Sequence, residues 1–208
     1  MARYTDAVCR LCRRAGEKLF LKGERCYTPK CGVEKRRKPP GSQPARRRRT
    51  SDWGTQLREK QKARQIYGVL ERQFLKYYSE ALRRPGITGS YLMQILEERL
   101  DNVAYRLNFA DSRSQARQLV THGHIKVNGK KVDIPSYRVR INDVVTWKES
   151  SKNLDMYSRM SQDIPRRPLP NWLALNVGNM EGTIISSPDM NEIDTGIDAR
   201  LVVEFYSR

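Results

Sequence analysis

Apolar residues recur at helical spacing through the middle of this 208-residue chain. Between residues 91 and 108 the main apolar positions are Leu92, Leu96, Leu100, Val103 and Leu107. Because they lie three or four residues apart, they fall on one face of an α-helix. The pattern therefore predicts a single amphipathic helix over residues 91–108.

A second helix is predicted from residue 112 onward. Ser112 is a favoured N-cap residue, and Gln115 three positions later completes a capping-box pattern. The apolar stripe that follows consists of Ala116, Leu119 and Val120. Gly123 stands where a left-handed residue is expected, so we expect the helix to end there.

Residues 125–147 carry the signals of a small antiparallel sheet. Asn128 and Gly129 form the dipeptide most typical of a two-residue hairpin, because both central residues must adopt positive φ. The apolar residues around this turn are Ile125, Val127 and Val132. Further strands are predicted at residues 137–141, where apolar and polar residues alternate, and at residues 144–147.

The segments before residue 95 are predicted to be helices, whereas the sequence signals of secondary structure are weaker after residue 147. A helix is predicted from Ser51 or Asp52 to Gly68, a second closes near Gly86, and a third begins at Thr88. Beyond residue 147 the predicted elements are a short helix at 153–161 and strands or extended edges at 172–177, 183–186 and 201–205. The predicted fold class is α+β, with a small helical domain and a module of two helices packed on a small antiparallel sheet.

The charge of the chain is strongly positive and unevenly distributed. There are 40 Lys and Arg against 23 Asp and Glu, a net charge of +17. Residues 1–50 alone hold 16 basic and 4 acidic residues. Such a balance indicates a polyanionic partner, above all a nucleic acid. A membrane partner is disfavoured, because no apolar run approaches the ~20 residues that span a bilayer and no secretory signal is evident. We therefore expect a cytoplasmic protein.

The predicted helix–hairpin module concentrates basic side chains. Its candidate RNA-binding residues are Arg106, Arg113, Arg117, His122, His124, Lys126, Lys130, Lys131 and Arg138. Guanidinium and ammonium groups bind phosphates, and a rigid basic surface recognises the backbone geometry of folded RNA. The alternative is a merely solvated charged face, which is what charge runs usually form.

All four cysteines lie in the first 31 residues, as two close pairs. Cys9 and Cys12 are followed after a short loop by Cys26 and Cys31, a spacing that suits tetrahedral thiolate coordination. We expect a structural zinc ion that supplies folding energy to this segment. An iron–sulfur cluster also takes four cysteines and remains the alternative. Free thiols do not explain the clustering, and disulfides are disfavoured in a reducing cytosol.

Two further basic segments follow the cysteines. Residues 34–50 are rich in Pro and Gly and hold a run of four basic residues, Arg46, Arg47, Arg48 and Arg49. We expect an extended arm that becomes ordered along phosphates, or else a solubilising linker. The helix after it would present its own basic face with Arg58, Lys60 and Lys62.

No catalytic constellation is evident in the sequence. Its two histidines, His122 and His124, flank Gly123 within the basic module. No nucleophile with a partner base accompanies them, and there is no phosphate-binding glycine loop. We therefore expect a binding protein and not an enzyme.

Short motifs spread over the chain resemble those of the ribosomal protein S4 family. They are RLDNV (99–103), SQARQLV (114–120), HGHI (122–125), VNG (127–129), PSY (135–137), CRLCRR (9–14), LREKQK (57–62) and VEFYSR (203–208). The resemblance implies a metal-binding knot and basic arm over residues 1–50, a helical domain over 51–95 and an RNA-binding module with extension over 96–187. It also implies that the tail, about 188–208, packs on the helical domain.

The same resemblance implies a function in the small ribosomal subunit. Members of the family bind rRNA at a multi-helix junction of the 5′ domain, nucleate assembly of the subunit body and influence translational accuracy. Neighbouring ribosomal proteins, S5 and functionally S12, are implied as partners. The basic arm is implied to lie near the path of messenger RNA into the subunit. An RNA-modifying enzyme with a similar module is the alternative, but residues outside the module leave no room for a catalytic domain.

Overall fold

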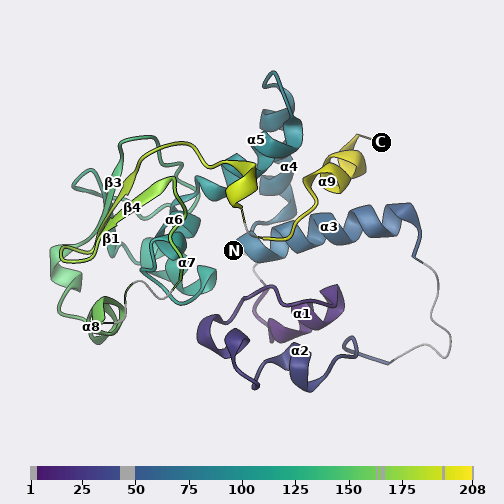
Figure 1. Ribbon diagram of the computed structural model, residues 1–208, viewed down its shortest axis with the longest axis horizontal. Coiled ribbons are helices and arrows are strands. Elements are labelled where there is room, and N and C mark those ends of the chain that lie inside the picture. The colour runs from purple at the N-terminus through teal and green to yellow at the C-terminus, as the bar shows by residue number, and fades with distance from the viewer. Residues whose placement is uncertain (1–3, 43–49, 163, 165–166, 194, 208) are drawn as a thin grey trace. The chain divides into compact units, whose positions relative to one another are not determined.

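The computed structural model describes residues 4–42, 50–162, 164, 167–193 and 195–207. The chain forms two compact units (Figure 1). Unit 1 comprises Met1–Leu92 and Thr195–Arg208, and unit 2 comprises Met93–Asp194. The four arginines of the predicted arm, Arg46 to Arg49, lie outside the described residues.

Unit 1 is helical throughout its described part. Its elements are α1 (Cys9–Ala15), a 3-10 helix η1 (Gly23–Tyr27), α2 (Gly32–Lys35), α3 (Asp52–Tyr67), α4 (Glu71–Leu82), the first half of α5 (Thr88–Glu97) and α9 (Ala199–Tyr206). The predicted boundaries of α3 are confirmed: the Ser51 hydroxyl accepts from the Gly54 backbone N–H, and Gly68 ends the helix at φ 61°.

The strand predicted at residues 201–205 is wrong, because this segment is the helix α9. Asp198 caps it by accepting from the backbone N–H groups of Arg200 and Leu201. α9 packs along α3, and the ring of Tyr206 stacks on Tyr78 with centroids 4.7 Å apart. Four apolar residues within five positions do not distinguish a buried strand from the face of a short helix, so the sequence pattern was ambiguous here.

Unit 2 combines helices with one antiparallel sheet. Its elements are the second half of α5, α6 (Leu100–Arg106), α7 (Arg113–Thr121), β1 (Ile125–Val127), β2 (Lys130–Lys131), β3 (Val144–Trp147), η2 (Glu149–Ser151), α8 (Asp155–Gln162), β4 (Leu173–Asn176), β5 (Glu181–Ile184) and η3 (Met190–Glu192). The strand order is β2-β1-β3-β5-β4. This mixture of helices and a small antiparallel sheet confirms the predicted class.

The core of unit 2 lies between the helix pair and one face of the sheet. Leu119 and Val120 of α7 are buried together with Ile125 of β1, and Trp147 of β3 is buried against Phe109. Val145 is buried as well, whereas its neighbours on β3, positions 144 and 146, are only partly buried. The alternation leaves the opposite face of β1 and β3 for polar side chains.

The single helix predicted over residues 91–108 is interrupted, because Arg99 is extended (ψ 134°) between α5 and α6. The backbone here pairs with the segment that was predicted as a strand at 137–141. The Leu100 N–H donates to the Tyr137 carbonyl, and the Val139 N–H donates to the Glu98 carbonyl. Only an isolated bridge, between Arg99 and Arg138, forms there. The predicted continuous helix and the predicted strand were therefore both wrong, because these two distant segments pair with each other.

Local signals elsewhere in unit 2 are confirmed. Asn128 and Gly129 adopt φ values of 49° and 76°, as a two-residue hairpin requires. The Ser112 hydroxyl caps α7 by accepting from the Gln115 N–H, and Gly123 follows the helix at φ 74°. Among the described residues, none of the helices is sufficiently long and apolar to cross a membrane.

Candidate nucleic-acid interface

The outer face of the β1–β2 hairpin carries paired lysines. Lys126 on β1 lies directly opposite Lys131 on β2, and Lys130, the other residue of β2, is exposed as well. Like charges directly opposite each other destabilise a sheet. Lys131 has one weak ion pair, at 3.5 Å to Asp133, and both side chains are more than half exposed. The opposed Lys126 and Lys131 therefore destabilise the hairpin, and a bound polyanion would offset this repulsion.

The end of α7 adds two histidines next to this hairpin. Gly123 separates them, and a Cβ atom there would lie 2.2 Å from Cε of Lys131, so the glycine gives the lysine room. His122 is exposed, whereas His124 is half-buried and its Nδ1 lies 2.9 Å from the Ser151 hydroxyl. Burial, and then the charges of His122 and Lys148, lower the pKa of His124.

Two of the predicted RNA-binding arginines are held by glutamates. Arg106 donates from Nε and Nη2 to the two carboxylate oxygens of the fully buried Glu97, at 2.9 and 2.7 Å. Arg138 donates to one oxygen of Glu98 at 3.2 and 2.8 Å. Both charges are compensated within unit 2, so these side chains first of all fasten α5 to α6 and to the 137–139 segment.

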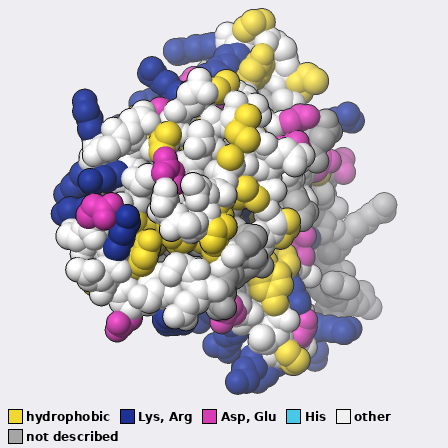
Figure 2. Space-filling model, turned by 60° about the vertical axis from the view of Figure 1, so that its left-hand side comes forward, with side chains coloured by type: hydrophobic (Ala, Val, Ile, Leu, Met, Phe, Trp, Pro, Cys, Tyr) yellow, Lys and Arg dark blue, Asp and Glu magenta, His cyan; other side chains and the backbone are white. Residues whose placement is uncertain are grey.

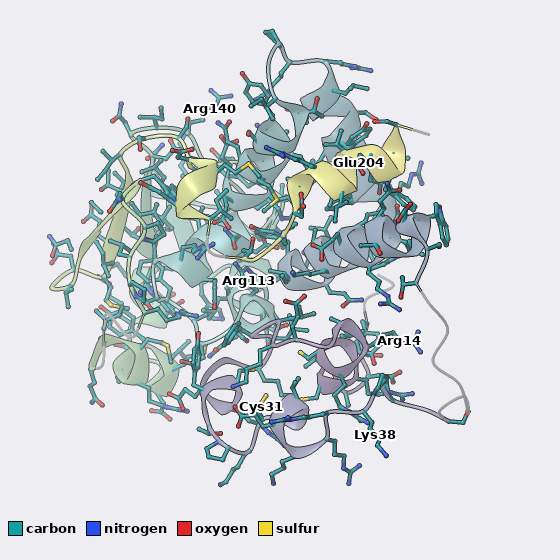
Figure 3. The ribbon with its side chains drawn as sticks, turned by 45° about the vertical axis from the view of Figure 1, so that its right-hand side comes forward. Arg14, Cys31, Lys38, Arg113, Arg140 and Glu204 are labelled. Atoms are coloured by element: carbon teal, nitrogen blue, oxygen red, sulfur yellow. The ribbon has the colours of Figure 1, made fainter. Side chains whose placement is uncertain are left out.

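Two residues in the first turn of α6, Asp101 and Asn102, orient Arg117 and Arg113 of α7. Asp101, 4% exposed, accepts from Arg99 at 2.8 Å and from Arg117 at 3.1 Å. The Asn102 side-chain oxygen accepts from Nε of Arg113 at 2.8 Å. Arg113 and Arg117 therefore leave α7 in fixed directions (Figure 3 labels Arg113), which pre-organises them for a ligand.

Sequence reasoning missed Arg167, which holds the loop before α7. Its guanidinium lies 3.8 Å from the ring centre of Tyr105 and donates to the carbonyls of Tyr105, Ala110 and Asp111. The guanidinium of Arg113 also lies over the ring of Tyr105, 4.4 Å from the ring centre. An arginine in a proline-rich stretch carries no periodicity, so no signal in the sequence pointed to this role.

In unit 1, the structure corrects the predicted basic face of α3. Lys60 is buried and donates to Glu71 at 3.0 Å, while lying 4.4 Å from the ring centre of Phe205. Lys62 is buried and pairs with Glu17 at 2.8 Å. Both face the packed side of α3, so neither belongs to an open basic surface. Arg58 is exposed.

The four cysteines line one small cavity of about 10 Å³ in unit 1. Cys12, Cys26 and Cys31 are buried, Cys9 is half-buried, and sulfur atoms gather between α1 and α2 near Cys31 in Figure 3. Burial raises the pKa of the Cys12 and Cys26 thiols. Within the described residues, no three Cys, His, Asp or Glu side chains stand in metal-holding geometry. The four thiols share a cavity, but the predicted metal knot stays a prediction.

The basic side chains of the surface occur in clusters. Figure 2 shows Lys and Arg gathered toward the margins of the displayed face, with apolar side chains between them. A basic sheet face, a basic helix end and pre-oriented arginines on one small α+β unit are typical of RNA-binding modules.

Comparison with known proteins gives the family. Residues 3–97 match the ribosomal protein S4/S9 N-terminal domain, and residues 98–145 match the S4 domain. Small ribosomal subunit protein uS4A of Clostridium botulinum is 54% identical over 208 residues, the full length of both chains. Small ribosomal subunit protein uS4 of Clostridium tetani and uS4A of Symbiobacterium thermophilum are each 53% identical, again over the full length of both chains. The chain belongs to the ribosomal protein S4 family, as its motifs indicated, and is therefore a structural protein and not an enzyme.

Proposed function

We propose that this chain is a structural component of the small ribosomal subunit in the cytoplasm and binds rRNA through unit 2. The single observation that carries the proposal is the cross-strand pair Lys126 and Lys131 on the outer face of the hairpin. Two directly opposed lysines repel each other, and a phosphate backbone bound to both would offset that repulsion. The histidines after α7 and the oriented Arg113 and Arg117 extend this surface over the helix.

The proposal has a finer part, which rests on the resemblance to the family. The rRNA site is a multi-helix junction of the 5′ domain, and binding there nucleates assembly of the subunit body. Ribosomal protein S5 is the proposed neighbour, S12 is a proposed functional partner, and an effect on translational accuracy is proposed. The arm with Arg46 to Arg49 is proposed to lie near the path of messenger RNA into the subunit.

The rRNA proposal is tested by titrating an rRNA 5′-domain fragment with the full chain at several salt concentrations. If about eight phosphates are contacted, the slope of log affinity against log salt is about −6 to −7. The variant K126Q/K131Q should make that slope shallower by roughly 2. The control K152Q/R159Q removes one charge directly after η2 and one from α8 of the same unit, and it should leave the slope unchanged. Equal slopes for wild type and K126Q/K131Q would contradict the proposal.

We also propose that Cys9, Cys12, Cys26 and Cys31 bind one structural zinc ion. The support is that all four thiols line one cavity, in a segment with few other buried side chains. Four thiolates are a complete ligand set for tetrahedral zinc, which would hold the α1–α2 segment together. Elemental analysis of the purified chain should give about one zinc per chain. Stoichiometric iron with a visible charge-transfer band would show an iron–sulfur cluster instead.

A further inference from the structure

Arg167 binds both ends of the loop that joins α6 to α7, although it lies 56 to 62 residues further along the chain. Its guanidinium donates at 2.9 Å to the carbonyl of Tyr105, in the last turn of α6, and at 3.2 Å to the carbonyl of Asp111, just before the cap of α7. Between them it donates to the Ala110 carbonyl. A cation at the end of a helix also interacts favourably with the helix dipole. Arg167 therefore ties the end of α6 to the start of α7.

The backbone of Arg167 is attached to the same loop through Asn108. The side-chain oxygen of Asn108 accepts from the backbone N–H and from Nε of Arg167, each at 3.1 Å, and its amide donates to the Arg167 carbonyl at 3.2 Å. Asn108 is buried and has a φ of 63°, a left-handed conformation that asparagine tolerates. Because Pro168 follows, Arg167 already favours an extended backbone. Both partners are thus held in one arrangement.

The ring of Tyr105 connects Arg167 to the RNA-binding surface. The guanidinium carbon of Arg167 lies 3.8 Å from the centre of this ring, and that of Arg113 lies 4.4 Å from it. Tyr105 is 7% exposed, so its ring is fixed by the surrounding core. Arg113 therefore takes its direction from Tyr105 and from its hydrogen bond to Asn102, and Arg167 fixes α7 relative to that ring.

The donors of Arg167 itself are directed into the protein. Its Nε, Nη1 and Nη2 atoms all donate to acceptors of the loop between α6 and α7. An arginine whose three nitrogens are engaged in this way has few donors left for a phosphate. Any contribution of Arg167 to RNA binding must then come from the geometry that it imposes on other residues.

We propose that Arg167 is a positioning residue for rRNA binding, which acts by orienting Arg113 through the ring of Tyr105. A basic side chain held in one direction distinguishes the contour of folded RNA, whereas a mobile one binds any polyanion. Arg167 lies outside residues 98–145, which match the S4 domain, so the specificity of this surface depends on the segment that follows the domain. The inference rests on the proposed rRNA-binding function.

The full chain is titrated with the rRNA 5′-domain fragment and with an RNA duplex of unrelated sequence. R167Q should weaken binding to the fragment about 10-fold and leave duplex binding unchanged, because only the fitted surface is lost. The salt slope should stay within about 0.3 of wild type, since a lost phosphate contact would change it by about 0.7 to 0.9. R167K keeps the charge without the fork of donors and should behave as R167Q. Wild-type discrimination by R167Q, or rescue by R167K, would overturn the proposal.

The route through Arg113 is tested with double variants. If Arg167 acts by orienting Arg113, then R113Q/R167Q should bind the fragment as weakly as R113Q alone. The matched control is R117Q/R167Q, in which the two losses should multiply, because Asp101 and not Tyr105 orients Arg117. Losses that multiply in R113Q/R167Q as well would show that the two residues act independently, against the proposal.

A general loss of stability is separated by I184A, which truncates a buried side chain of β5 in the same core. Circular dichroism checks that every variant is folded, and I184A should discriminate the fragment from the duplex as wild type does. An equal loss of discrimination in I184A and R167Q would overturn the role of Arg167. The proposed rRNA binding is judged separately, from the salt slopes of wild type and K126Q/K131Q, in which residue 167 is unchanged.

Discussion

Asp101 is the residue on which the orientation of the α7 arginines depends. It accepts hydrogen bonds from Arg99, from Arg117 and from the backbone of Asn102, while it is almost completely buried. Removing one partner from a buried charge cluster leaves the other charges unpaired, which costs more than the ion pairs themselves stabilise. The sequence motif RLDN thus encodes a support for the RNA surface as well as a helix start.

We predict that Asp101→Asn lowers the free energy of unfolding of unit 2 by about 3–5 kcal/mol. Arg99 is 2% exposed and would lose its ion pair with Asp101 while keeping its charge. Urea denaturation followed by tryptophan fluorescence measures the change, since Trp147 and Trp172 are both buried in unit 2. Asp133→Asn is the control, because that carboxylate is more than half exposed and should give wild-type stability. Equal stability of the two variants would contradict the role of Asp101.

Glu71 makes the stability of unit 1 depend on pH. Burial alone would raise its pKa, but hydrogen bonds from Tyr206 and Lys60 outweigh burial and lower the pKa below the ordinary 4.5. A lowered carboxyl pKa contributes stability above the unfolded pKa, and that contribution is lost as pH falls through the folded value. Wild-type stability should therefore decline below about pH 4.5.

We predict that Glu71→Gln flattens this acid-side decline. The substitution removes the titrating group while keeping an acceptor near the Tyr206 hydroxyl, which lies 2.6 Å from the carboxylate. Thermal unfolding between pH 3 and pH 6 measures the difference, with Glu149→Gln, an exposed glutamate of unit 2, as control. An identical pH profile for wild type and Glu71→Gln would exclude Glu71 as the source.

At the scale of elements, local chemistry could be predicted and long-range pairing could not. The Ser112 cap, the Asn128-Gly129 turn and the end of α3 at Gly68 follow from residue preferences within a few positions. The break at Arg99 depends on hydrogen bonds to a segment almost forty residues away. Likewise, α9 is a helix in contact with α3, and the apolar residues of segment 201–205 alone fit either a helix or a strand.

Gly182 shows another contact between elements that the sequence does not reveal. A Cβ atom at this position of β5 would lie 2.3 Å from Cδ1 of Leu107, at the end of α6. Real Cβ atoms do not approach so closely, so β5 and the end of α6 can pack at this distance only because residue 182 has no side chain. Leu107 itself is fully buried.

We predict that Gly182→Ala costs about 1–3 kcal/mol through overpacking. Leu107→Ala alone should cost about 2–5 kcal/mol by leaving a cavity. The double variant should be less destabilised than the sum of the two, because the new methyl group occupies the vacated space. Urea denaturation of the four proteins completes the cycle, and strict additivity would show that the two positions do not touch.

At the scale of the whole molecule, charge composition predicted an RNA-binding protein but not which charges meet the RNA. Arg58, Lys60 and Lys62 look equivalent in the sequence, yet only Arg58 is exposed. The difference arises because the other two lie on the side of α3 where Glu71 and Glu17 compensate them.

The cysteine segment has little hydrophobic core of its own. Between residues 4 and 42 the buried apolar side chains are Leu19 and three of the cysteines, Cys12, Cys26 and Cys31. So small a core contributes little stability to α1 and α2 by burial, and the proposed metal would supply the missing folding free energy. Unit 2 has an extensive core and should not depend on a metal.

We therefore predict that a strong chelator at pH 7 raises amide hydrogen exchange in α1 and α2 and leaves α6 and α7 unchanged, as measured by mass spectrometry of the full chain. The variant C26S/C31S should show the same fast exchange in α1 without chelator, because two thiolates cannot complete a tetrahedral site. Chelator should then have no further effect on that variant. Exchange in α1 that is slow and insensitive to chelator in the wild type would show that burial alone orders the segment, and that the four thiols hold no metal.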